Sequence, residues 1–299
     1  MPIRQITVIG TGLIGGSFAL ALRKRGFAGR IIGCDREPTL KRAKTGGAID
    51  TGYTKPTEAV RGSQLVVLAT PVLAILDLLQ RLAPCLPANT LLTDVGSTKT
   101  LVAERGLSVF GKNARKRFLP GHHMAGKEQS GIEYAGADLF QNAVWFLTPF
   151  PEQSLNEGIF AEFAGWIDQI GARIAIMPPA EHDHLCAWIS HLPQMLSTAL
   201  AASLVEEFGA DAPLLSMGGR ALHEMTRISA SPYATWRDIA ISNKKNLEES
   251  WLKLEQRLAH IRENLSTRQL AQEFEQAQGL RKTAESTTET RSHGAEKNR

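Results

Sequence analysis

The chain has 299 residues, of which 43% are hydrophobic and 21% are charged, and its formal net charge is +4. This length suits two domains of ordinary size. The apolar stretches are shorter than the ~20 residues of a membrane span and no signal segment opens the chain, so no membrane partner is expected. The mild charge predicts no nucleic-acid partner. Three widely spaced cysteines have neither disulfide nor metal-ligand spacing, which predicts a cytoplasmic protein.

A glycine-rich turn follows the first predicted strand. The apolar run 6–9 predicts a buried strand, and Gly10, Gly12 and Gly15 follow it in G-x-G-x-x-G spacing. Gly10 permits a tight turn, Gly12 lets the backbone approach a pyrophosphate, and Gly15 lets a helix pack close to the strand. That helix is expected from about residue 17 to 25, with its N-terminal N–H groups free for phosphate.

An acidic residue ends the second predicted strand, 31–34. Asp35 lies about 20 residues after the last glycine, where a carboxylate binds the ribose hydroxyls of NAD. Arg36 leaves NADP possible, because a basic residue can accommodate a 2′-phosphate. The expected cofactor contacts are Gly10, Gly12, Leu13, Ile14, Gly15, Asp35, Arg36, Thr70 and Asp94.

Strand-like and helical segments alternate up to the Pro178-Pro179 pair. The pattern predicts an α/β fold, a doubly wound Rossmann-type parallel sheet followed by an all-α domain. Further strands are expected at 65–69, 91–94, 117–119, 143–147 and 173–176, and helices at 39–46, 72–86 and 155–170. Because ligands lie beyond the C-terminal ends of parallel strands, Thr70, Asp94 and Ser97 are expected near the cofactor.

The sequence predicts three regions: an NAD-binding domain at 1–178, a helical substrate-binding and dimerisation domain at 179–279, and a disordered polar tail at 280–299. A long helix at 182–208, kinked by Pro193, is apolar on most faces. It is expected to be buried, either inside the domain or across the interface of a homodimer. Helices are also expected at 212–229, 234–264 and up to about 278.

A few polar residues are candidates for chemistry. His122 is expected on a loop just after a strand, which suits a general base. His182, His184 and His191 lie on or beside the long helix, where hydrogen-bonded core histidines are commoner, and their spacing predicts no metal site. Arg227 lies in an apolar helical region and needs an anionic partner, either a protein carboxylate or a substrate one.

Five motifs occur together and in order: VIGTGLIGGS, DVGSTK, HHMAGKEQSG, HDHLCAWISHLPQ and TRIS…SPYATWRDIAISN. In this combination the chain resembles the prephenate/arogenate dehydrogenase family. The resemblance covers the chain up to about residue 280. It implies NAD-dependent oxidative decarboxylation of prephenate, or of its transaminated relative arogenate, in tyrosine biosynthesis.

The resemblance also implies roles for individual residues. His122 corresponds to the histidine that accepts the proton of the ring hydroxyl, Ser97 to a serine that hydrogen-bonds the same region, and Arg227 to an arginine that holds a substrate carboxylate. The remaining substrate-pocket positions are Glu128, Ser190, His191, Gln194 and Trp236.

The motifs depart from the family at three positions. His123 follows His122 and competes for its role. Gln194 stands where the family has a second pocket histidine. Arg220 stands in a turn that is usually rich in glycine, and either adds a second cation to the site or caps a helix.

Two other functions are alternatives for this sequence. A 3-hydroxyacid dehydrogenase also combines a Rossmann domain with a helical one, but typically uses a catalytic lysine, for which Lys244 and Lys245 are the nearest candidates. An NAD-sensing protein without turnover would bind the cofactor and show no substrate-dependent reduction.

Overall fold

The computed structural model describes residues 2–296, with side chains placed up to residue 282. The chain divides into two compact units, Met1–Leu247 and Glu248–Arg299, and each is described by itself.

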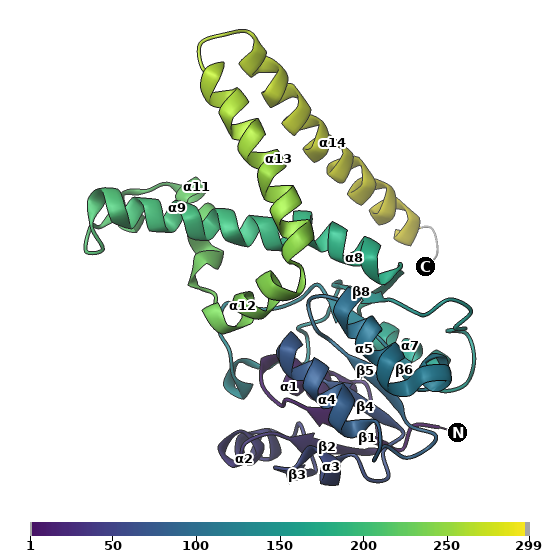
Figure 1. The fold of residues 1–299 in the computed structure, drawn as a ribbon. Helices are drawn as coiled ribbons and strands as arrows, with labels where there is room; N and C mark the ends of the chain where they lie inside the picture. The colour runs from purple at the N-terminus through teal and green to yellow at the C-terminus, as the bar shows by residue number, and fades with distance from the viewer. Residues whose placement is uncertain (1, 297–299) are drawn as a thin grey trace. The chain divides into compact units, whose positions relative to one another are not determined.

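The first unit is built on a six-stranded sheet with the order β3-β2-β1-β4-β5-β6 (Figure 1). All its strand pairs are parallel. The strands are β1 (Gln5–Ile9), β2 (Arg30–Cys34), β3 (Thr51–Tyr53), β4 (Leu65–Leu68), β5 (Leu91–Asp94) and β6 (Phe118–Leu119). The strand order reverses direction between β1 and β4, and ligands of doubly wound sheets bind at this switch point. The predicted doubly wound parallel sheet is confirmed.

Alternate side chains of the central strands enter two hydrophobic cores, one on each face of the sheet. In β1, Ile6 and Val8 belong to one core and Ile9 to the other. Helices α1 and α7 supply the first core, whereas α4 and α5 supply the second. Full burial of each large apolar side chain contributes about 1.5–3 kcal/mol. The helices of this region are α1 (Leu13–Lys24), α2 (Glu37–Thr45), α3 (Pro56–Ala59), α4 (Val72–Leu82), α5 (Thr100–Phe110), α6 (Ala114–Arg117) and α7 (Gly158–Gln169), with 3₁₀ turns η1 (Gly111–Asn113) and η2 (Ile132–Tyr134).

A second, smaller sheet carries His122. It contains β7 (Gly121–His123), β8 (Val144–Leu147) and β9 (Arg173–Ile176), with β7 antiparallel to β8 and β8 parallel to β9. The expectation that His122 lies on a loop was therefore wrong. Pro120, which has no N–H to continue β6, separates it from β7, and the chain moves to the second sheet there.

The predicted long helix is present but interrupted. It consists of α8 (Pro179–Cys186), a π-helical turn η3 (Ala187–His191) and α9 (Leu192–Phe208). Pro193 lacks an N–H group, so the regular hydrogen-bond ladder cannot continue through it, and the helix widens over the preceding turn. The kink expected at Pro193 stays a prediction, and what the structure has before this residue is a change of helix type.

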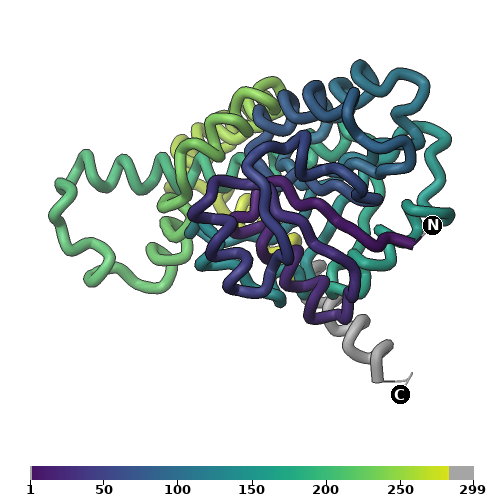
Figure 2. Tube along the Cα trace, turned by 90° about the horizontal axis from the view of Figure 1, so that it is seen from below, coloured from purple at the N-terminus to yellow at the C-terminus, as the bar shows by residue number. Residues whose placement is uncertain are grey.

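The chain then returns beside α9, and Figure 2 shows this antiparallel segment in green as a projecting arm. Its elements are α10 (Leu214–Met217), α11 (Arg220–Thr226) and the 3₁₀ turn η4 (Arg227–Ala230), and α12 (Tyr233–Ser242) follows. The single helix predicted at 234–264 is divided at Asn243, which ends α12 before α13 begins.

Helix α13 (Lys244–Glu263) leads into the second unit, where α14 (Gln269–Glu296) follows it. Arg257 pairs with Glu273 at 2.7 Å and links the two helices. Region 280–299 was expected to be disordered, yet α14 continues to Glu296, and residues 297–299 lie outside the described residues. A polar composition argues against a packed core, but Ala, Glu, Arg and Lys all favour helix. Among the described helices, none is both long and apolar enough to cross a membrane.

Candidate active site

The glycine turn between β1 and α1 has the geometry of a dinucleotide cradle. Gly10 has a φ of +91°, and a Cβ there would collide with the carbonyl oxygen of Ala69. A Cβ at Gly15 would collide with the carbonyl oxygen of Gly10, so this glycine permits the close packing of helix and strand. A Cβ at Gly12 would meet nothing within 4 Å. The space beside Gly12 is therefore open to a ligand at the N-terminus of α1.

Helix α1 begins at Leu13, four residues earlier than predicted, which places Leu13 and Ile14 in its first turn. Leu13 is buried, while Ile14 is half-buried and packs against the first core. The N-terminal N–H groups of the helix therefore directly follow Gly12. This arrangement aims backbone donors at the open space beside that glycine.

The acidic residue at the end of β2 is held by the backbone. Asp35 Oδ2 accepts a hydrogen bond from the Thr11 N–H at 2.8 Å, and Oδ1 accepts one from the Arg36 N–H at 2.7 Å. The half-buried carboxylate thus lies against the glycine turn, and the Arg36 side chain is exposed. Thr70 Oγ1 is buried without a hydrogen-bond partner among the described residues, and its methyl group lies next to Gly10. An orphaned hydroxyl beside the turn fits a polar ligand there.

Asp94 was expected to contact the cofactor, and in the structure its side chain is engaged within the protein. Its carboxylate is fully buried and forms an ion pair with Lys99 Nζ, which also donates to the Gly121 carbonyl oxygen at 2.7 Å. Asp94 accepts further hydrogen bonds from the N–H groups of Gly96 and Gly121. Burial raises the pKa of Asp94 and lowers that of Lys99, and each partner opposes the shift of the other. Asp94 therefore fixes the loop after β5 against β7, and hence the backbone beside His122.

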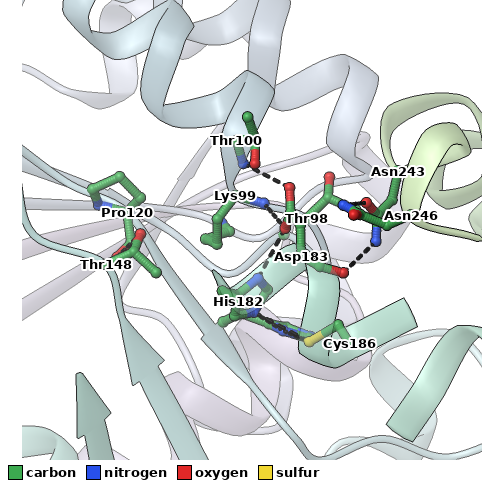
Figure 3. A network of polar contacts seen from close by, with 12 residues as sticks. Thr98, Lys99, Thr100, Pro120, Thr148, His182, Asp183, Cys186, Asn243 and Asn246 are labelled. Atoms are coloured by element: carbon green, nitrogen blue, oxygen red, sulfur yellow. Dashed lines mark hydrogen bonds and ion pairs between the residues drawn. The ribbon is translucent and has the colours of Figure 1, made fainter. Parts of the chain in front are cut away.

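His122 lies at one end of a hydrogen-bonded chain of three side chains. Its Nδ1 is 2.9 Å from Nε2 of His182, and Nδ1 of His182 is 2.9 Å from Oδ1 of Asp183. Asp183 also accepts the N–H groups of Lys99 at 2.6 Å and Thr100 at 2.8 Å, at the start of α5 (Figure 3). The positions of His182 and Asp183 on α8 are thereby tied to the Rossmann part of the chain.

The network determines which nitrogen of His122 is free. Burial raises the pKa of Asp183, but hydrogen bonds from His182, Thr100 and Lys99 outweigh it and hold the carboxyl below its usual range. The ionised carboxylate therefore accepts Nδ1–H of His182, which leaves His182 Nε2 as the acceptor for Nδ1–H of His122. Burial, together with neighbouring His182, lowers the pKa of His122 well below 6.5. His122 is thus neutral at physiological pH, with Nε2 available to accept a proton.

His123 faces the opposite side of β7, as alternation along a strand requires. Its ring packs edge-on against Phe140 at 5.3 Å and lies 5.7 Å from the ring of Trp145. Both aromatic residues belong to the first hydrophobic core. Of the two adjacent histidines, only His122 is joined to the polar network of α8.

Arg227 and Glu128, both predicted to bind substrate, lie together. Arg227 Nη1 forms an ion pair with Oε1 of Glu128, and the side chain of Arg227 is 65% exposed. Gln194 is buried, and its Nε2 donates at 2.9 Å to the carbonyl oxygen of Ile228, the residue after Arg227. The amide of Gln194 thus supports the turn that presents the guanidinium.

The π-helical turn contains Ser190 and His191 at its end. Ser190 is half-buried. His191 is fully buried, 3.2 Å from Asn243 Nδ2, with its ring edge-on to Trp236 at 6.1 Å. Burial lowers the pKa of His191 to about 4, and its Nε2 has no partner among the described residues. Such π-turns occur frequently at functional sites.

Two other predicted positions stand apart from this network. Ser97 is half-buried in the loop that Asp94 and Lys99 hold. Arg220 is the exposed first residue of α11. A cation at a helix N-terminus opposes the helix dipole, so the structure does not favour a capping role for Arg220.

Sequence reasoning missed the roles of Asp183, Lys99 and Cys186. The contacts that join these residues across the fold, such as the bond from the Lys99 N–H to Asp183 over 84 positions, leave no local sequence pattern. A usable signal was the helical i,i+4 spacing of His182 and Cys186, which places both side chains on one face.

Comparison with known proteins gives the family of the chain. Residues 18–176 match the prephenate dehydrogenase nucleotide-binding domain, and residues 178–279 match the prephenate dehydrogenase dimerization domain. The chain is 32% identical to a prephenate dehydrogenase of Lactococcus lactis subsp. cremoris, over 85% of this chain and 72% of that protein. It is 35% identical to a prephenate dehydrogenase of Bacillus subtilis, over 81% of this chain and 65% of that protein.

A solved structure is similar over almost the whole chain. It is the crystal structure of prephenate dehydrogenase from A. aeolicus in complex with hydroxyphenyl propionate and NAD+. The TM-score is 0.80 at 28% sequence identity, covering 97% of this chain and 99% of that one. Two domain matches and these relatives agree, and the chain belongs to the prephenate dehydrogenase family.

Proposed function

We propose that this chain catalyses the NAD-dependent oxidative decarboxylation of prephenate to 4-hydroxyphenylpyruvate. The observation that carries the proposal is the hydrogen-bonded chain from Asp183 through His182 to His122, which leaves Nε2 of His122 as a proton acceptor. Family membership supplies the substrate class, and the histidine supplies the base that oxidation of a ring hydroxyl requires.

The glycine turn fits a dinucleotide. Gly12 and the first turn of α1 would hold the pyrophosphate, the carboxylate of Asp35 would bind the ribose hydroxyls, and Thr70 Oγ1 would gain its missing partner. When bound, NAD+ supplies the electron acceptor for the reaction. A carboxylate in the position of Asp35 repels a 2′-phosphate, so NAD is proposed over NADP. The exposed side chain of Arg36 is the cation that could bind the 2′-phosphate of NADP.

His122 acts as the general base and takes the proton of the substrate hydroxyl on Nε2. The imidazolium that forms donates Nδ1–H to His182, whose other nitrogen is held by ionised Asp183. His182 and Asp183 are positioning residues: they hold the tautomer and orientation of His122 and stabilise its positive charge. General-base catalysis of this kind contributes about 10²–10⁴-fold in rate. The hydroxyl of Ser97, in the adjacent loop, is proposed to hydrogen-bond the same region of the substrate.

Arg227 is proposed to bind a carboxylate of the substrate. The ion pair with Glu128 and the 65% exposure of the Arg227 side chain support this role, and the substrate carboxylate would replace or share that partner. Loss of CO2 makes the substrate ring aromatic, which drives the reaction. The protein therefore needs chiefly to hold the dianion in place and to remove one proton.

Arogenate is the alternative substrate. It carries an amino group where prephenate has a keto group, and Gln194, Ser190, His191 and Trp236 are the proposed contacts of this region. Gln194 is already bonded to the Ile228 carbonyl oxygen, so its amide supports the Arg227 turn and adds no charge. Because Gln194 adds no carboxylate for the amino group and the carboxylate of Glu128 is paired with Arg227, prephenate is proposed as the substrate.

We also propose the division of labour between segments and a homodimer. Residues 1–178 bind the cofactor, and residues 179–279 bind the substrate and the second subunit. Helix α9 exposes Val205 by 51% and Phe208 by 58%, and a groove of about 830 Å³ lies between its C-terminal end and residues 209–230. A matching dimerization domain and this uncovered apolar surface both support pairing with a second copy.

A four-way assay tests the proposed function. The purified chain is given prephenate or arogenate, each with NAD+ or NADP+, and reduced cofactor and CO2 are measured. We expect prephenate with NAD+ to give the highest kcat/KM and one CO2 for each cofactor reduced. Higher kcat/KM with arogenate would move the assignment to arogenate dehydrogenase. Cofactor binding with no turnover of either substrate would refute the proposed catalysis.

A further inference from the structure

Three atoms that can bind a metal lie close together at the proposed base: Nδ1 of His122, Nε2 of His182 and Sγ of Cys186. The proton transfer proposed above does not use the Cys186 thiol. Cys186 Sγ lies 3.4 Å from Nε2 of His182 and 3.9 Å from Nδ1 of His122. With the 2.9 Å between the two nitrogens, these distances close a triangle of two imidazoles and a thiol. All three residues are buried.

The triangle has nearly the dimensions of a tetrahedral zinc site. Zn²⁺ holds nitrogen at about 2.0–2.1 Å and sulfur at about 2.3 Å, which separates two nitrogens by about 3.3 Å and a nitrogen from sulfur by about 3.6 Å. Each of the three separations differs from these values by less than about half an ångström. Small side-chain shifts would bring all three atoms to one ion, with a fourth position left for water.

The surroundings of the triangle also match a metal site. Metal-bound histidines almost always donate their other ring N–H to a carboxylate or carbonyl, which fixes the tautomer and raises ligand basicity. His182 does this, because its Nδ1 is bonded to Asp183 Oδ1 at 2.9 Å. Asp183 is in turn fixed by the N–H groups of Lys99 and Thr100 and, through its own carbonyl oxygen, by Asn243 Nδ2 (Figure 3). One ligand is therefore already oriented.

We propose that His122, His182 and Cys186 form an inhibitory binding site for Zn²⁺ or a similar thiophilic divalent ion. Binding uses the lone pair of His122 Nδ1, the lone pair of His182 Nε2 and the Cys186 thiolate. The Cys186 proton is released to solvent. The proton of His122 moves from Nδ1 to Nε2, because Nδ1 now carries the metal.

This change of tautomer has a direct consequence for turnover. With a proton on Nε2, His122 no longer accepts the substrate proton, and its hydrogen bond to His182 is lost. The inhibitory effect rests on the proposed function, whereas the metal site itself does not. An ion held at Nδ1 should therefore stop catalysis while leaving the glycine turn of the cofactor site unchanged.

Cobalt spectroscopy tests the site without using catalysis. Co²⁺ is titrated into the full chain after reduction and metal removal, and the thiolate-to-Co²⁺ charge-transfer band and the tetrahedral d–d bands are recorded. Zn²⁺ is then added in competition. We expect both bands at one equivalent per chain, and their loss when Zn²⁺ replaces Co²⁺.

Cysteine variants locate the ligand. Cys186→Ala should abolish the charge-transfer band and weaken metal binding more than about tenfold. The controls are Cys34→Ala, at another buried thiol, and Cys85→Ala, at the exposed one; both should keep the band. NAD+ binding to each variant checks that it is folded, and Cys186→Ser provides a second test if the alanine variant fails. A band that persists in Cys186→Ala, or no binding to the folded wild-type chain, would overturn the proposal.

Inhibition is measured separately. In the wild type and in both control variants, Zn²⁺ should lower turnover and a chelator should restore it, while Cys186→Ala should need more than about tenfold more Zn²⁺. Equal sensitivity of Cys186→Ala would refute the inhibitory role. If no substrate is turned over, the cobalt bands still decide whether the site exists, so failure of the site and failure of the proposed function are distinguishable.

Discussion

Acidification should lower the free energy of unfolding strongly, because the folded chain buries neutral imidazoles. Burial lowers the pKa of His123 and that of His191 from 6.5 to about 4. Below pH 6.5 the unfolded chain therefore binds more protons than the folded one, and the free energy of unfolding falls as the pH falls. At pH values above 6.5 these two groups are neutral in both states, and their contribution no longer changes.

The expected magnitude follows from the two pKa values. At about pH 5, an imidazole whose pKa is about 4 in the folded chain and 6.5 in the unfolded chain costs about 2 kcal/mol relative to neutral pH. His123 and His191 together cost about 4 kcal/mol. The pKa values of His122 and His182 are lowered by burial as well and add to the loss. A loss of this size is a large part of the ~5–15 kcal/mol that stabilises a typical domain.

Urea unfolding at about pH 7.5 and about pH 5, at one protein concentration, measures this loss. His123→Leu should reduce the difference between the two pH values by about 2 kcal/mol, since it removes one buried imidazole. Phe140→Leu is the matched control, because Phe140 packs against His123 but does not titrate. A difference below about 1 kcal/mol in the wild type, or no change in His123→Leu, would contradict the proposed cost of protonating these buried imidazoles.

Three substitutions test the site further. Asp183→Asn should lower kcat by about 10–100-fold, since His182 loses its anionic partner. Stopped-flow or steady-state turnover measures this loss, and NAD+ affinity should be unchanged. Arg227→Ala should raise KM about 10–100-fold with a smaller effect on kcat, because a charge-assisted hydrogen bond contributes about 1.5–3 kcal/mol. The control is Arg220→Ala, which removes an exposed arginine on α11 and should leave KM within about twofold. Asp35→Ser should shift the NADP+ to NAD+ ratio of kcat/KM upward by about tenfold, measured with both cofactors.

The fold could be predicted because its signals are local. Continuous apolar runs marked the buried parallel strands, and the glycine spacing marked the turn after β1. Helix α1 begins earlier than predicted. Leu13 and Ile14 lie among glycines, which disfavour helix, and yet both are helical. The change of sheet at Pro120 was not predicted, since two-residue β6 and three-residue β7 are too short to show a period.

The site was predicted in part. Its individual residues were visible: His122, Arg227 and Glu128 stand in recognisable motifs, and the last two form an ion pair in the structure. Which groups support them was not visible. The carboxylate of Asp94 is paired with Lys99, and the bond between His122 and His182 joins residues 60 positions apart. Such contacts depend on tertiary packing that no periodicity encodes.

Nε2 of His122 is the proposed general base. Turnover of His122→Asn is measured with saturating prephenate and NAD+, beside a His184→Asn control on the exposed face of α8. His122→Asn should lower kcat by about 10²–10⁴-fold, with NAD+ affinity and the melting temperature close to those of the wild type. Turnover of His122→Asn within a few-fold of the His184→Asn control would contradict the assignment.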